Sequence, residues 1–209
     1  MTQDDIVQVA ASQVGYHEKV TNTPTADLYP FQNAYDGTDN WTKFHNELGI
    51  AQGSAWCGFF CYWVFWSLLG RSKTNTDNFL HGIDSWGGYV SAWKNAFSAA
   101  GYYFEAGTYK PNVGDVVLFA DTGIPYSHAE IVVDTSGWPN TINTIGGNTK
   151  QTSGGSGTEA ESAWVARRSR SATATTGFHI IGYCAINAQG GSSSGTIIFK
   201  RRRIGTAFG

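Results

Sequence analysis

The sequence has few cysteines and little charge, and both shortages narrow the class of protein. Of its 209 residues only three are cysteine, and 14% are Asp, Glu, Lys or Arg. Three cysteines cannot form a fully paired disulfide framework, and no C-x-x-C pair typical of a structural zinc site is present. We therefore expect a chain that folds around a hydrophobic core in a reducing cytoplasm, without a metal or other cofactor.

Long hydrophobic runs are also missing. The longest one, residues 55–69, falls short of the ~20 residues that span a bilayer, so it predicts a buried helix rather than a stable membrane insertion. The N-terminus, MTQDDIVQVAASQVGYHEK, carries acids where a secretory signal peptide carries positive charge. We expect no signal peptide.

Excess positive charge is confined to one place. The formal net charge is −2, and the run KRRR at residues 200–203 holds four of the 14 basic residues. The preceding body is mildly acidic, which argues against a nucleic-acid partner. The KRRR run itself has two interpretations: attraction to anionic polymers or membrane headgroups, and a solvated tail.

The hydrophobic periodicity changes along the chain from helical to extended. Helical spacing predicts helices over residues 4–14, 56–70 and 85–101, with short turns in the polar and aromatic segment 19–53. Short β-branched segments then predict strands at 113–120, 127–134, 141–148 and 179–186. Helices followed by antiparallel strands indicate an α+β fold. We assign residues 1–187 to one domain, and residues 188–209 to a Gly/Ser linker and a basic tail.

Cys57 stands at the start of the long apolar helix, in SAWCGFFCYWVFWSLLG. Unpaired backbone N–H groups and the positive end of the helix dipole stabilise a thiolate there and make it a nucleophile. Cys61 lies one turn further in, where those donors are already used. For Cys57 the alternative is inert core packing.

The candidate general base is His128, which opens the strand SHAEIVVD after a turn. A histidine on a rigid strand start can reach a thiol at a helix N-terminus. The third polar group that orients such an imidazole could be Asn148, on the next strand, or Glu130, on the same face of the same strand. Glu130 could instead bind a substrate amine. For Asn148 a plain turn role after two glycines, and for Glu130 a half-exposed strand position, are the alternatives.

These motifs together resemble the CHAP domain, the cysteine- and histidine-dependent amidohydrolase/peptidase family of the NlpC/papain-like superfamily. SAWCGFFCYWV resembles its nucleophile helix, VGDVVLF and SHAEIVVD resemble its G-D and S-H strands, and TIGGNT resembles the strand of its third polar residue. The resemblance runs from about residue 4 to 187. It implies a papain-like fold in which N-terminal helices pack on an antiparallel sheet.

Carried over by position, the resemblance makes Cys57 the nucleophile, His128 the base and later the acid, and Asn148 the third catalytic residue. Many members have a glutamate where this sequence has Gly146. The sequence therefore departs from the family pattern at the third catalytic residue. Some members bind calcium through closely spaced aspartates. Asp36 and Asp39 lack a D-x-D pattern, and we expect an ordinary turn there.

Aromatic residues are the remaining candidates for the substrate cleft. We expect the substrate-binding set to be Glu130, Trp41, Trp56 and Tyr126, with core packing as the alternative for each aromatic residue. Trp63 and Trp66 are expected in the core. The stretch NWTKF, residues 40–44, resembles a segment that precedes the cysteine in phage-type members.

The resemblance implies a peptidoglycan hydrolase that cuts an amide bond of the bacterial wall, as an endopeptidase or an N-acetylmuramoyl-L-alanine amidase. A phage endolysin or tail-associated lysin fits an expected lack of a signal peptide. Such a protein is found in the host cytoplasm and then at the wall, or on the virion with phage tail proteins as partners. The alternatives are a non-catalytic wall-binding module and an NlpC-type cysteine peptidase with a non-wall substrate.

Overall fold

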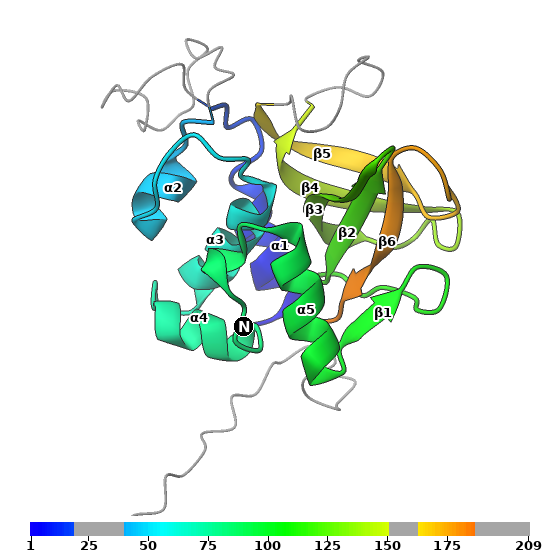
Figure 1. The fold of residues 1–209 in the computed structure, drawn as a ribbon, viewed down its shortest axis with the longest axis horizontal. Helices are drawn as coiled ribbons and strands as arrows, with labels where there is room; N and C mark the ends of the chain where they lie inside the picture. The colour runs from blue at the N-terminus through cyan, green and yellow to red at the C-terminus, as the bar shows by residue number, and fades with distance from the viewer. Residues whose placement is uncertain (19–39, 151–162, 187–209) are drawn as a thin grey trace, which may run out of the picture.

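The fold combines a group of helices with one antiparallel sheet, which confirms the predicted α+β class (Figure 1). The structure is a computed structural model, and it describes residues 1–18, 40–150 and 163–186. Asp36, Asp39, the linker at 188–195 and the KRRR run lie outside the described residues. So does the predicted boundary after residue 187, and the division into two parts stays a prediction.

The helices occupy the N-terminal half of the chain. Two of the three predicted helices are confirmed, α1 with a capping box between Thr2 and Asp5, and α3, which begins at Cys57. One of the short turns predicted within residues 19–53 is confirmed as helix α2, whereas helix α4 was not predicted. Their bounds are α1 Gln3–Ala11, α2 Lys43–Leu48, α3 Cys57–Leu68, α4 Lys73–Phe79 and α5 Val90–Ala100.

The single helix predicted over residues 85–101 is wrong in its first part. A short 3-10 turn, η2 Ser85–Gly87, precedes α5, and Trp86 within it has a left-handed φ of 55°. The chain turns here because it passes close to the start of α3. A Cβ on Gly58 would lie 2.1 Å from the carbonyl oxygen of Gly87, so only glycine permits this approach.

All strand pairs of the sheet are antiparallel, in the order β1-β6-β2-β3-β4-β5. The four predicted strands are confirmed as β2 Val116–Asp121, β3 Ile124–Asp134, β4 Thr141–Thr149 and β6 His179–Cys184. Two edge strands, β1 Tyr103–Glu105 and β5 Trp164–Ser171, were not predicted.

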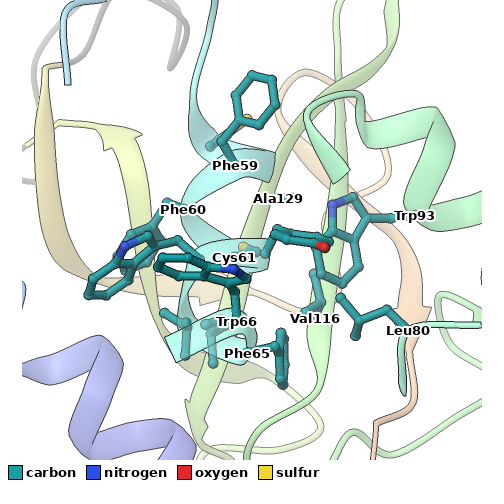
Figure 2. Close-up of a cluster of buried hydrophobic side chains, with 14 of the residues drawn as sticks. Phe59, Phe60, Cys61, Phe65, Trp66, Leu80, Trp93, Val116 and Ala129 are labelled. Atoms are coloured by element: carbon teal, nitrogen blue, oxygen red, sulfur yellow. The ribbon is translucent and has the colours of Figure 1, made fainter. Parts of the chain in front are cut away.

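Helix α3 forms the centre of the core. It is apolar on every side and ten of its twelve residues are buried, as expected for a helix surrounded by protein. Phe60, Cys61 and Phe65 from this helix meet Val116 and Ala129 from the sheet in one cluster (Figure 2). Val117 and Phe119, which alternate with Val116 along β2, belong to a second, smaller cluster on the opposite face of the sheet.

Strands β3 and β4 stop pairing near the start of α3. The pairing of β3 with β4 runs from Asp134 to Ile131, which lies opposite Ile145, and does not continue toward His128. Gly147 on β4 instead faces the helix, since a Cβ there would lie 2.5 Å from the Trp56 ring. The N-terminus of α3 thereby reaches the part of β3 that carries the histidine.

Candidate active site

Cys57 is the first residue of α3, and no side chain caps the N-terminus of this helix. The preceding residue, Trp56, makes no side-chain capping hydrogen bond, so the first-turn N–H groups remain directed at the site. The Cys57 thiol lies close enough to the imidazole of His128, and to the backbone of Ala129 and Gly58, for all three to lower its pKa. The two predicted partners, Cys57 and His128, are thus brought together.

His128 is held between a carboxylate and the thiol. Its Nε2 lies 3.1 Å from Oε1 of Glu130, which leaves Nδ1 for Cys57. The rings of Phe119 and Phe178 lie 6.0 Å from the imidazole, centroid to centroid, and limit its rotation. A histidine that is fixed by a carboxylate on one nitrogen offers the other nitrogen to a nucleophile.

The electrostatics favour an ion pair. Burial raises the pKa of the Cys57 thiol, but the charge and hydrogen bond of His128 outweigh it, and the pKa lies below its ordinary value. Burial lowers the pKa of His128, but Cys57 and Glu130 raise it to about 9. The two groups titrate together and favour a thiolate beside an imidazolium.

Glu130 is fully buried, with every acceptor position used. Oε1 accepts from His128 and from Nη2 of Arg170, and Oε2 accepts from the Thr144 hydroxyl at 2.6 Å and from Nε of Arg170 at 2.9 Å. Burial raises the pKa of this carboxyl, but the Arg170 guanidinium and His128 hold it well below its usual range. Glu130 is therefore a carboxylate throughout the physiological range.

The other two cysteines differ from Cys57. Cys61 and Cys184 have no exposed surface, whereas Cys57 keeps 4% of its own. Burial and the nearby Cys57 and Glu130 raise the pKa of the Cys61 thiol well above its ordinary value, and burial and Asp115 do so for Cys184. Of the three cysteines, only Cys57 has both exposed surface and a lowered thiol pKa.

Asn148 lies on β4, nearly fully buried, in a left-handed backbone conformation with φ of 53°. Nε2 of His128 already has Glu130 as its partner, and among the described residues no hydrogen bond joins the Asn148 amide to the imidazole. Asn148 therefore lacks the hydrogen bond to His128 by which an orienting residue acts, whereas Glu130 has it.

The predicted substrate-binding residues have different surroundings. Trp56 and Glu130 have no exposed surface, which corrects the expectation that they contact substrate. Trp56 instead stacks on Phe44 at 5.4 Å and donates its indole N–H to Glu18 at 2.7 Å. Trp41 is half-buried, and Tyr126 is 41% exposed, so these two keep surface for a ligand.

Arg170 and Thr144 complete the buried network and were not predicted. Arg170 comes from β5, with its guanidinium 4.8 Å from the Phe178 ring centre. From Ala166 onward the segment does alternate, because Ala166 and Arg170 are buried on one side and the exposed Arg167 and Ser169 lie on the other, but its charges conceal the strand signal.

Two absences concern the described residues alone. Across residues 1–18, 40–150 and 163–186, no group of three or more His, Cys, Asp or Glu side chains is placed to hold a metal ion. In the same part of the chain no helix has both the length and the apolar character that a membrane span needs.

Comparison with known proteins agrees with this geometry. Residues 49–148, from just before the cysteine to the end of β4, match the model of the CHAP domain family. This part of the chain is therefore similar to the CHAP domain family. CHAP domains are as a family hydrolases, amidases and peptidases that act on peptidoglycan. The match includes Cys57, His128, Glu130 and Asn148 but ends before Arg170.

Outside the family model the similarity is distant. No curated protein matches the chain at a significant level. Among solved structures, the chain is similar to one titled "The crystal structure of Ly7917", with 15% identity and a TM-score of 0.45 over 88% of this chain. The chain spans 61% of the length of that structure.

Proposed function

We propose that this protein hydrolyses an amide bond of bacterial peptidoglycan, with Cys57 as nucleophile and His128 as general base and acid. The observation that carries the proposal is the pairing of Cys57 with His128 at the start of α3, where no side chain caps the helix and each of the two groups shifts the pKa of the other. A buried thiolate–imidazolium pair at a helix N-terminus is suited to acyl transfer, and peptidoglycan is the substrate of the CHAP family.

The reaction follows from the positions of these groups. The Cys57 thiolate attacks the amide carbonyl carbon, and the carbonyl oxygen becomes an oxyanion beside the first-turn N–H groups of α3. The C–N bond then breaks, and the imidazolium of His128 gives its proton to the departing amine. Neutral His128 next takes a proton from water, whose oxygen attacks the thioester and releases the acid and the Cys57 thiolate.

The finer activity is an endopeptidase or an N-acetylmuramoyl-L-alanine amidase, in a phage endolysin or a tail-associated lysin. Either role would place the protein in the host cytoplasm and then at the wall, or on the virion. The exposed Tyr126 and the half-buried Trp41 are the remaining candidates for direct contact with the wall peptide.

The test is mass spectrometry of purified peptidoglycan digested with the wild type, with Cys57→Ala and with Cys61→Ala. The last is the matched control, because it truncates a cysteine one turn further along α3. New amine termini with the wild type and Cys61→Ala, and none with Cys57→Ala, would support the proposal, and the fragment masses would name the bond.

If folded wild type cut no wall preparation, the proposal would fail and the wall-binding module would be the better interpretation. Release of γ-linked fragments from a non-wall substrate alone would favour an NlpC-type peptidase. Equal cleavage by the wild type and Cys57→Ala would remove Cys57 from the reaction.

A further inference from the structure

Glu130 and Gly146 occupy one space between β3 and β4. A Cβ built on Gly146 would lie 2.6 Å from both Cγ and Oε1 of Glu130. These contacts are far inside van der Waals distance, so a side chain at position 146 and the present carboxylate exclude each other. The glycine therefore leaves free the volume that the glutamate fills from the neighbouring strand.

The carboxylate in that space is attached to the reacting histidine. Glu130 follows His128 by two residues, so both side chains leave the same face of β3, and Oε1 meets Nε2 at 3.1 Å. The Thr144 hydroxyl and the forked guanidinium of Arg170 hold the other acceptor positions. No freedom remains for Glu130 to leave the imidazole or to bind a substrate.

We propose that Glu130 is the positioning residue of His128, that Gly146 is the vacated position that admits it, and that Arg170 locks it in place. Glu130 thereby takes the role that Asn148 would otherwise have. The carboxylate fixes the tautomer and the orientation of the imidazole, so that Nδ1 faces Cys57, and it stabilises the imidazolium that protonates the leaving amine. This inference rests on the proposed function for its catalytic meaning.

A titration of His128 tests the positioning role without any substrate. Nitrogen-15 NMR of the imidazole is followed with pH in the wild type, in Glu130→Gln and in Tyr109→Phe. Tyr109→Phe is the control, because it removes a hydrogen bond to another buried carboxylate, Asp115, at 2.9 Å. We expect the His128 midpoint to fall by about 1–3 pH units in Glu130→Gln and to stay in place in Tyr109→Phe.

The same variants are then assayed on peptidoglycan. For Glu130→Gln we expect kcat to fall on the order of 10²-fold with KM little changed, because the imidazole is misplaced while the substrate surface is intact. If Glu130→Gln fails to fold, because Arg170 loses its carboxylate, then Glu130→Gln/Arg170→Met takes its place. A wild-type His128 titration in the folded variant would overturn the proposal, whether or not the wild type cuts peptidoglycan.

Moving the carboxylate tests the shared space directly. We expect Glu130→Ala to behave as Glu130→Gln does, and Glu130→Ala/Gly146→Asp to regain at least tenfold in kcat and part of the lost His128 midpoint. Aspartate is chosen because the Cβ at position 146 already lies 2.6 Å from the present carboxylate oxygen. No gain over Glu130→Ala would contradict the claim that the two positions serve one carboxylate site.

Discussion

Arg170 is expected to contribute more to the stability of this protein than any surface charge does. Its guanidinium is almost fully buried and donates through Nε and Nη2 to the buried Glu130. Replacing it by Met keeps contact with the Phe178 ring but leaves a buried carboxylate without its main counterion. Breaking a buried pair in this way costs about 3–5 kcal/mol.

Thermal unfolding followed by circular dichroism measures this cost. For a chain of 209 residues each 1 kcal/mol lowers Tm by about 2–4 °C, so Arg170→Met should lower Tm by about 6–20 °C. The matched control is Lys73→Met, which removes the half-exposed ion pair with Asp77 and should cost about 0–1 kcal/mol.

A double-mutant cycle identifies the cause. Glu130→Gln/Arg170→Met removes both charges, so it should be much less destabilised than the two single variants added together. Strictly additive effects would refute the reasoning. So would an Arg170→Met variant no less stable than Lys73→Met, because the buried carboxylate would then not depend on Arg170.

Three further outcomes follow from the same contacts. Peptidoglycan cleavage, followed as kcat/KM against pH, should decline as pH rises through about 9, because His128 loses its proton there. On the acid side it should decline only below the ordinary thiol pKa, because the lowered pKa of Cys57 keeps the thiolate until then. Gly147→Ala should lower the free energy of unfolding by about 1–3 kcal/mol in urea titrations, because its Cβ would lie 2.6 Å from Cβ of Phe60. Burial lowers the pKa of His45 from 6.5 to about 4. The stability that neutral His45 contributes is therefore complete above pH 6.5 and is lost as pH falls toward 4. Urea titrations of His45→Asn should show a smaller loss of unfolding free energy over the same pH range.

The elements that carry Cys57 and His128 could be predicted from the sequence, because each depends on local information. The apolar run after Cys57 is longer than a strand and too uniform for a surface helix, so it predicts a central helix. SHAEIVVD and TINTIGGN carry the β-branched residues and turn boundaries of strands. The order of these elements along the chain then predicted that Cys57 and His128 act as a pair.

The remaining features depend on tertiary contacts that no local pattern contains. The break before α5 exists because Gly87 packs against Gly58, more than 20 residues earlier in the chain. The choice between Glu130 and Asn148 depends on the space above Gly146, which is visible only once β3 and β4 lie side by side. Strand β5 was missed because its buried arginine looks like a surface charge in the sequence.

The central claim is that His128 ionises Cys57 at the start of α3. The most direct measurement is the rate of Cys57 alkylation by iodoacetamide against pH, read by peptide mass spectrometry in the wild type and in His128→Gln. The account predicts a wild-type midpoint below the ordinary thiol value of about 8.5, and a midpoint at or above that value in His128→Gln, where the imidazole no longer offsets the effect of burial. Equal midpoints in the two proteins would contradict the account.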